Sequence, residues 1–282
     1  MSPASPPGDV PPPRKALGQH FLHDRTAIAR IVEGAGVTSG DRVLEIGPGT
    51  GALTRALLDA GARVWAVEAD PRMVAYLEAQ GWEGLHVIQG DALRTDFPAL
   101  AREAGGRFRL VANLPYNISG PLLALLLEQR AAFSSMTVML QREVAERLLA
   151  PPGGRSRGVL SVLAQAFCRV RPVLRVRPGA FWPPPRVESQ VVRLDVRAGP
   201  VEPLADEAAF RSVVRVAFGR RRKMLRNALG PLLGRDADAC FRAAGLSGRE
   251  RPEELPVETW IRLANAVTAV GRGRLVRDRP TR

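Results

Sequence analysis

The segment "NLPYNIS" at residues 113–119 joins two carboxamides, a proline and an aromatic ring. This combination suits one difficult reaction, nucleophilic attack by the amino group of a nucleobase. Such an amino group is a weak nucleophile, because its lone pair is delocalised into the ring. The side-chain oxygen of Asn113 and a backbone carbonyl can each accept a hydrogen bond from that amino group and hold its nitrogen closer to tetrahedral. Pro115 stiffens the turn, and Tyr116 offers a face on which an extruded base can stack. We therefore predict that Asn113, Leu114, Pro115 and Tyr116 form a catalytic turn.

A second set of candidate residues surrounds a glycine-rich turn. Gly47, Gly49 and Gly51 follow the apolar run "VLEI" and precede a helical pattern, so backbone N–H groups can approach an anionic or polar ligand. Glu68 ends the next apolar run, where a carboxylate can accept hydrogen bonds from both hydroxyls of a ribose. Taken alone, this spacing also fits a dinucleotide fingerprint, because Ala52 completes the pattern G-x-G-x-x-A.

Two further carboxylates favour S-adenosylmethionine over a nicotinamide dinucleotide. Glu45 lies just before the glycine turn, a poor neighbour for a pyrophosphate but an acceptable one for a sulfonium ligand that carries an ammonium group. Asp91, in "GDA" after the third apolar run, can accept a hydrogen bond from the amino group of adenine. We expect no metal site, because the three histidines have no partners that would complete a zinc ligand set.

The elements that must position these residues alternate along the chain. Apolar periodicity predicts helices over 27–37, 52–59 and 71–79 and strands over 43–46 and 63–67. Strands at "LHVIQGDA", "RLVANLPY" and "MTVMLQ", with a helix at "PLLALLLEQ", continue the alternation. Helices at "REVAERLLA" and "LSVLAQAF" precede strand patterns at "CRVRPVLRVRPGAF" and "SQVVRLDV". This order predicts an α/β fold with a doubly wound, parallel, Rossmann-like sheet.

The domain organisation follows from a change of pattern near residue 200, beyond which only helices are predicted. We expect a disordered proline-rich tail over 1–13, a methyltransferase domain over 14–200, a smaller all-helical domain over 201–270 and a basic tail over 271–282.

Composition limits the class of protein. The 282 residues carry a formal charge of +13 and a sequence pI of about 11.3, which indicates an anionic partner, nucleic acid before membrane surface. Cys168 and Cys240 follow no metal or redox spacing and are predicted to be buried free thiols in a reducing cytosol. No apolar run approaches the roughly 18 residues of a membrane span. We expect a soluble, cytoplasmic protein.

Over nearly its full length, from about Arg14 to the last helices, the chain resembles the KsgA-type (RsmA) family of ribosomal RNA adenine dimethyltransferases. The resemblance is carried by "LGQHFL", "VLEIGPGTGALT", "VEAD", "GDAL", "NLPYNIS", "FWPPPRVES" and "RRRKMLRNAL". It implies a class I methyltransferase that uses S-adenosylmethionine to dimethylate the exocyclic amino groups of two adjacent adenines in the 3′-terminal hairpin of 16S rRNA. The implied partner is the small ribosomal subunit, 30S or its precursor, with a role in its maturation, and we expect a monomer.

The resemblance also implies the roles of individual residues. Expected contacts with S-adenosylmethionine come from His20, Leu22, Gly47, Gly49, Glu68, Asp91 and Asn113. His20 is often asparagine in the family, so its contact runs through the backbone or a ring nitrogen. Phe181, ahead of the "PPP" run, is implied as the second stacking face beside Tyr116.

A basic segment follows the strands. If residues 210–229 formed one helix, Arg211, Arg215, Arg222 and Arg226 would lie on one side of it. A break at Gly219 would instead place 220–223 at the basic start of a second helix. Phosphate contacts, which position RNA without reading its sequence, are expected from Arg155, Arg157, Arg220, Arg221, Arg222, Lys223 and Arg226.

Three other functions fit part of this pattern. An erythromycin-resistance-type enzyme methylates 23S rRNA on the same catalytic fold, and the long basic C-terminal region argues against it. A non-catalytic RNA-binding assembly factor would have no need of the intact Asn113, Pro115 and Tyr116. An NAD-dependent oxidoreductase would bind a nicotinamide cofactor and have no affinity for S-adenosylmethionine.

Overall fold

A computed structural model describes residues 10–14, 17–220 and 223–271, and the chain forms two compact units. One unit holds the residues up to 145 together with 170–196, and the other holds 146–169 and the residues from 197 onward. The second unit thus includes residues 146–169, which the sequence-based division assigns to the methyltransferase domain.

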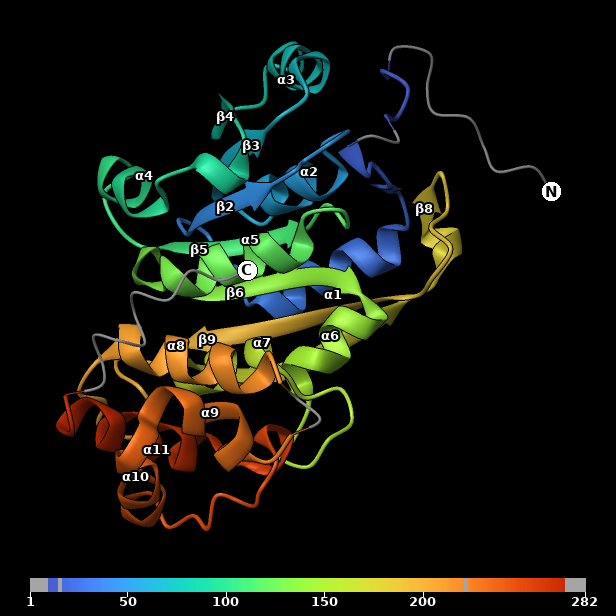
Figure 1. Cartoon of the computed structure of the whole chain (residues 1–282). Coiled ribbons are helices and arrows are strands. Elements are labelled where there is room, and N and C mark those ends of the chain that lie inside the picture. Colours follow the sequence, from blue (N-terminus) through green and yellow to red (C-terminus); the bar gives the residue numbers. More distant parts are fainter. Residues whose placement is uncertain (1–9, 15–16, 221–222, 272–282) are drawn as a thin grey trace. The chain divides into compact units, whose positions relative to one another are not determined.

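The first unit is built on a seven-stranded sheet with the strand order β4-β3-β2-β5-β6-β9-β7, most of which can be followed in Figure 1. Its strands are β2 (Arg42–Ile46), β3 (Arg63–Glu68), β4 (Leu85–Gln89), β5 (Phe108–Asn113), β6 (Phe133–Gln141), β7 (Cys168–Val176) and β9 (Ser189–Val196). The neighbouring strands from β4 to β6 pair in parallel, whereas β9 pairs antiparallel to β6. The Rossmann-like α/β fold is confirmed, and the sheet is mixed rather than wholly parallel.

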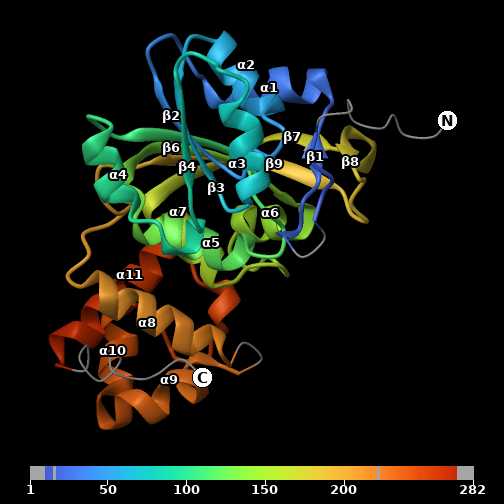
Figure 2. The ribbon, with the colours of Figure 1, turned by 90° about the horizontal axis from the view of Figure 1, so that it is seen from above.

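Helices cover both faces of the parallel strands. Figure 2 shows α1 and α2 on one side of the sheet and α4 and α5 on the other. The helices up to the end of the strand region are α1 (Arg25–Ala35), α2 (Ala52–Asp59), α3 (Pro71–Glu78), α4 (Phe97–Glu103), α5 (Ser119–Glu128), α6 (Arg142–Leu149) and α7 (Val159–Phe167). Because both faces are covered, the central strands read as continuous apolar runs, and Val43, Leu44 and Val64 are fully buried.

Two very short strands were not predicted as separate elements, and the strand predicted over 168–181 is divided between β7 and the first residue of one of them. Strand β1 (Phe21–Leu22) pairs antiparallel with β8 (Phe181–Trp182), which lies 160 residues later in the chain. A two-residue strand gives no periodic signal, since its hydrogen bonds depend on a partner that is distant in sequence. This pairing fixes the segment before α1, where the ring of Phe21 lies close to Gly49 of the glycine turn.

The second unit, called the C-terminal unit below, holds α7 together with α8 (Glu207–Phe218), α9 (Leu225–Leu233), α10 (Ala237–Ala243) and α11 (Val257–Ala269), and no strand lies beyond β9 among the described residues. Helix α8 ends at Phe218 with Gly219 as its C-cap, so the alternative with a break at Gly219 is confirmed. Arg211 is buried on α8, where its guanidinium pairs with Glu207 at 2.7 Å and lies over the ring of Phe167. The prediction that Arg211 belongs to an exposed basic side of one helix is therefore wrong.

Arg157 corrects a second expectation about the basic residues. Its side chain is fully buried, so it cannot serve as an exposed phosphate contact. The guanidinium donates to the carbonyl of Ala150 at 2.7 Å, to Oε1 of Gln165 at 2.9 Å and to the carbonyl of Leu255 at 3.1 Å. Burial lowers the pKa of this guanidinium, and the carboxylate of Glu258 opposes that shift. Arg157 thus ties its own loop to α7 and to the segment before α11.

We predict that Arg157→Met lowers the free energy of unfolding by roughly 3 kcal/mol, because the Leu255 carbonyl and Oε1 of Gln165 lose the Arg157 donor. The Ala150 carbonyl, by contrast, keeps a hydrogen bond from Nε2 of Gln165. Urea denaturation followed by circular dichroism measures the change. Arg155→Met is the matched control, since Arg155 is exposed in the same loop and its loss should cost less than about 0.5 kcal/mol. Equal stability of the two variants would show that the hydrogen bonds of Arg157 do not stabilise the fold.

Candidate active site

The candidate site lies where the parallel strands end. Strands β2, β3, β4 and β5 finish at Ile46, Glu68, Gln89 and Asn113, and carboxyl ends of parallel strands share one edge of a sheet. A cavity of about 340 Å³ opens there. Its lining includes all of the residues expected to contact the cofactor, together with the whole catalytic turn: His20, Leu22, Glu45, Gly47, Gly49, Glu68, Asp91, Asn113, Leu114, Pro115 and Tyr116.

The backbone of the glycine turn adopts φ angles that residues with a side chain rarely adopt. Gly47, Gly49 and Gly51 have φ angles of 67°, 54° and 78°, in the left-handed region that favours glycine. A Cβ on Gly49 would lie 2.8 Å from the ring of Phe21. A Cβ on Gly47 would lie 3.4 Å from Pro115, so the glycine turn and the catalytic turn already approach each other closely. Both conditions explain why glycine is needed here.

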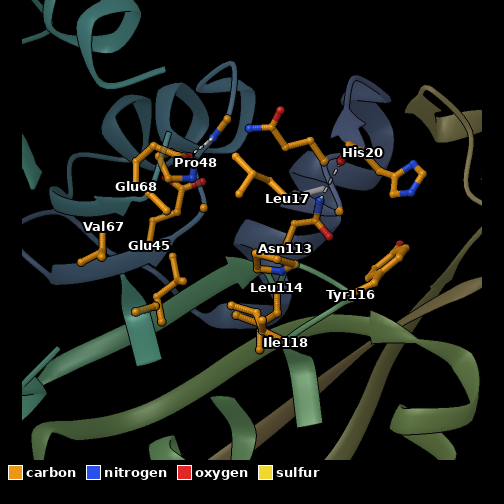
Figure 3. A pocket seen from close by; sticks show the side chains of 18 of the residues that line it. Leu17, His20, Glu45, Pro48, Val67, Glu68, Asn113, Leu114, Tyr116 and Ile118 are labelled. Atoms are coloured by element: carbon orange, nitrogen blue, oxygen red, sulfur yellow. Dashed lines mark hydrogen bonds between the residues drawn. The ribbon is translucent and has the colours of Figure 1, made fainter. Parts of the chain in front are cut away.

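Two buried carboxylates face this cavity from neighbouring strands (Figure 3). Glu68 accepts hydrogen bonds from the backbone N–H groups of Asp70 at 2.8 Å and Gly49 at 3.3 Å, which hold its carboxylate beside the glycine turn. Glu45 accepts one from the hydroxyl of Thr54 at 2.6 Å. Desolvation by burial raises the pKa of both carboxyl groups, that of Glu45 to about 8. The nearby charge of Glu68 adds to the shift at Glu45.

Asp91 and Leu22 complete the cavity wall on either side of these carboxylates. Asp91 follows β4, and its Oδ1 accepts a hydrogen bond from the backbone N–H of Leu93 at 2.9 Å. The side chain is exposed and retains oxygen lone pairs for a ligand. Leu22 is buried in β1 and supplies an apolar surface.

Asn113 has its amide orientation fixed by one hydrogen bond. Its Nδ2 donates to the main-chain carbonyl of His20 at 3.1 Å (Figure 3), and this donation assigns the other amide atom, Oδ1, as the free acceptor. Among the described residues, Oδ1 is buried without a hydrogen-bond partner. A buried acceptor with no donor is costly, so it indicates a donor that arrives with a ligand.

Tyr116 is held at its hydroxyl by Ser189. The two oxygen atoms lie 2.5 Å apart, and Ser189 is the buried first residue of β9. Burial raises the pKa of the Tyr116 phenol, so the ring stays neutral over the ordinary pH range. Sequence reasoning missed Ser189, although it stands in the quoted motif "FWPPPRVES", because nothing in the spacing of that motif reveals a partner 73 residues away.

Phe181 departs from its expected position. Its ring is only 1% exposed and packs in an apolar cluster with Leu22, Ile28 and Val191, and it does not line the cavity that Tyr116 lines. The pairing of β1 with β8 directs the side chain into this cluster. In this structure Phe181 is therefore not a second stacking face, and the ring that stacks on Tyr116 is that of His20.

The remaining basic residues belong to the C-terminal unit. Arg155, Arg220, Lys223 and Arg226 are exposed, as a contact with phosphate requires. Arg226 also pairs with Asp238 at 2.8 Å. Arg221 and Arg222 lie outside the described residues.

The donor set fits a cationic adenosyl ligand. The cavity offers a glycine cradle and two carboxylates from β2 and β3, which suit S-adenosylmethionine, and the unpartnered Oδ1 of Asn113 remains as an acceptor for a further group. Within the described residues, no group of three or more His, Cys, Asp or Glu side chains could hold a metal ion. In that same part of the chain, every helix is too short or too polar to cross a membrane.

Comparison with known proteins identifies the family. A model of the family described as "Ribosomal RNA adenine dimethylase" matches residues 12–269. Ribosomal RNA small subunit methyltransferase A of Pseudomonas aeruginosa is 47% identical over 254 residues, which cover 89% of this chain and 93% of the relative. The protein of the same name in Rhodospirillum rubrum is 45% identical over 284 residues and covers 95% and 96%.

Solved structures agree with this assignment. A dimethyladenosine transferase from Plasmodium falciparum superposes with a TM-score of 0.74 at 28% identity, over 89% of this chain and 98% of that one. The 23S rRNA methyltransferase ErmE superposes with a TM-score of 0.66 at 30% identity, over 88% and 99%. The chain belongs to the ribosomal RNA adenine dimethylase family of S-adenosylmethionine-dependent methyltransferases.

Proposed function

We propose that this protein dimethylates the exocyclic amino groups of two adjacent adenines in the 3′-terminal hairpin of 16S rRNA, on the small ribosomal subunit or its precursor. The observation that carries the proposal is the buried, unpartnered Oδ1 of Asn113 beside the Tyr116 ring, because an acceptor and a flat face together match an amino group on a base. The resemblance to small subunit methyltransferases over 89% and 95% of the chain supports the choice of RNA.

The carboxylates of the cavity and the catalytic turn have separate proposed roles. Glu68 would accept hydrogen bonds from the ribose hydroxyls and Asp91 from the adenine amino group of S-adenosylmethionine, which would supply an electrophilic methyl group. Oδ1 of Asn113 accepts one N–H of the target amino group and a backbone carbonyl of the turn accepts the other. These two acceptors would aim the nitrogen lone pair at the methyl group that S-adenosylmethionine would transfer. The protonated product amine is acidic enough to lose its proton to water, so positioning supplies most of the rate gain.

The C-terminal unit is proposed to hold the RNA through its exposed cations. Phosphate contacts from Arg155, Arg220, Lys223 and Arg226 would position the hairpin without reading its sequence, and Arg221 and Arg222 stay predictions. We further propose that the protein acts as a monomer in the cytoplasm, within a two-domain organisation of a methyltransferase and a helical RNA-binding region.

A direct test compares substrates. Purified protein with radiolabelled S-adenosylmethionine should methylate small subunits that lack the modification and leave protein-free 23S rRNA unmodified. Mass spectrometry of the product should locate two adjacent dimethyladenines. Transfer to 23S rRNA alone would assign the chain to the erythromycin-resistance type, and transfer to neither would support a non-catalytic assembly factor.

We predict that Asn113→Ala lowers kcat for methyl transfer by at least about 100-fold, because the amino group loses the acceptor that orients it. Affinity for small subunits should stay within about twofold, since binding rests on phosphate contacts far more than on one amide. Steady-state kinetics and filter binding measure the two quantities. Turnover near that of the parent protein would remove Asn113 from the proposed role.

Glu45 should make cofactor binding depend on pH. Its carboxyl group is protonated below about pH 8 in the free cavity, and a cationic ligand favours the carboxylate, so binding expels a proton. Affinity for S-adenosylmethionine should therefore rise between about pH 6 and 7.5, a range in which the ligand's own α-amino group remains largely charged.

Calorimetry at about pH 6.5 in two buffers of different protonation enthalpy counts the released proton. Glu45→Gln is the matched control, because it keeps a hydrogen-bond acceptor for Thr54 and removes the titrating group. If parent and variant release the same number of protons, Glu45 does not titrate with the ligand.

We expect Arg220→Glu combined with Lys223→Glu to weaken subunit binding and to reduce the salt dependence of log K by roughly one for each lost phosphate contact. Arg30→Glu with Arg102→Glu makes the same change in net charge at exposed helical positions of the other unit. Filter binding across a salt series separates the pairs, and identical slopes would place RNA binding elsewhere.

A further inference from the structure

One face of the Tyr116 ring is already covered by another ring. The centroids of the His20 and Tyr116 rings lie 5.5 Å apart with an interplanar angle of 29°, within the range of a single stacked pair. A base placed between them would form two stacked pairs, which need about 9 Å between the outer centroids even at the short end of that range. No base can enter between the two rings while they remain at this distance.

The two rings differ in how firmly they are held. Tyr116 belongs to the stiff catalytic turn, and Ser189 anchors its hydroxyl at 2.5 Å. Within the part of the chain that the structure describes, the imidazole of His20 has one hydrogen bond, from Nδ1 to the carbonyl of Pro183 at 2.7 Å. Because a carbonyl can only accept, Nδ1 carries the proton in this bond. Of the two rings, that of His20 is the one that can leave by side-chain rotation.

The backbone of residue 20 need not move with the ring. Its carbonyl accepts from Nδ2 of Asn113 at 3.1 Å, and the next two residues form β1, which pairs with β8. Figure 3 shows the ring of His20 turned away from Asn113 and lying on the same side as the Tyr116 ring. Rotation about the side-chain bonds of His20 therefore frees the stacking face and leaves the orientation of the Asn113 amide intact.

We propose that His20 is a gating residue: its imidazole covers Tyr116 in the free protein and is displaced by the target adenine of the RNA. The bond from Nδ1 to Pro183 is the latch. This inference rests on the proposed function, since it names the occupant that replaces the ring. An RNA whose base must displace the ring binds more weakly than it would to an uncovered tyrosine, in proportion to the fraction of protein that is open.

The test measures the dissociation constant for unmethylated small subunits with the protein saturated by S-adenosylhomocysteine, and the KM for subunits in methyl transfer. His20→Ala removes both ring and latch and should lower the dissociation constant and KM about three- to tenfold. His20→Asn removes the ring and should act in the same direction. If the alanine variant folds poorly, as judged by circular dichroism and S-adenosylhomocysteine binding, His20→Asn replaces it in the test.

His23→Ala is the matched control, because His23 is exposed three positions away and does not line the cavity. A rise in the dissociation constant for the folded His20 variants would overturn the gate and make the imidazole a stacking partner of the bound base. An unchanged constant would overturn it in favour of plain packing. Methylation of small subunits by the parent protein tests the proposed function separately, so failure of the gate and failure of the function are distinguishable.

Discussion

The hydrogen bond from Nδ2 of Asn113 to the carbonyl of His20 decides what this site can do. A carboxamide has a donor end and an acceptor end, and committing the donor leaves the acceptor as the group presented to a ligand. Reversed, the same side chain would present N–H groups to the amino group of a base, and both would be donors. The glycine cradle and the carboxylates are placed by other bonds, and this choice decides which atom Asn113 presents to the ligand that they admit.

Several levels of structure converge on that bond. Strand β5 brings Asn113 to the carboxyl edge of the sheet, and the pairing of β1 with β8 brings the carbonyl of His20 to the same place. Pro115 packs near Gly47, so the catalytic turn and the glycine turn are adjacent parts of one wall. A parallel sheet with crossovers supplies this edge as a general feature, and the particular residues at the four strand ends supply the chemistry.

The sequence predicts the parts of this arrangement that are local. Apolar runs located the parallel strands, the bounds of α2 were predicted to the residue, and the residues expected at the cofactor site line one cavity. What could not be predicted depends on partners far along the chain. The β1–β8 pair, the Ser189 contact and the burial of Phe181 each join segments separated by 70 residues or more. The prediction that Arg157 contacts phosphate was wrong for another reason. Nothing in the sequence of a glycine-rich loop indicates that carbonyl groups will surround an arginine within it.

The two buried carboxylates influence the release of the spent cofactor after each methyl transfer. Glu45 and Glu68 stand in a cavity that disfavours their negative charge until a cation arrives. Transfer of the methyl group converts the sulfonium to a neutral thioether, so the spent cofactor no longer offsets the charge at the sulfur position. The α-ammonium group of the ligand is unchanged by the transfer, so only the attraction of the carboxylates to the sulfonium is lost, and the cavity holds the thioether less firmly than the sulfonium it came from. An enzyme that adds two methyl groups to each base must exchange its cofactor between additions, and a cavity with this charge arrangement favours release of the spent form over its retention.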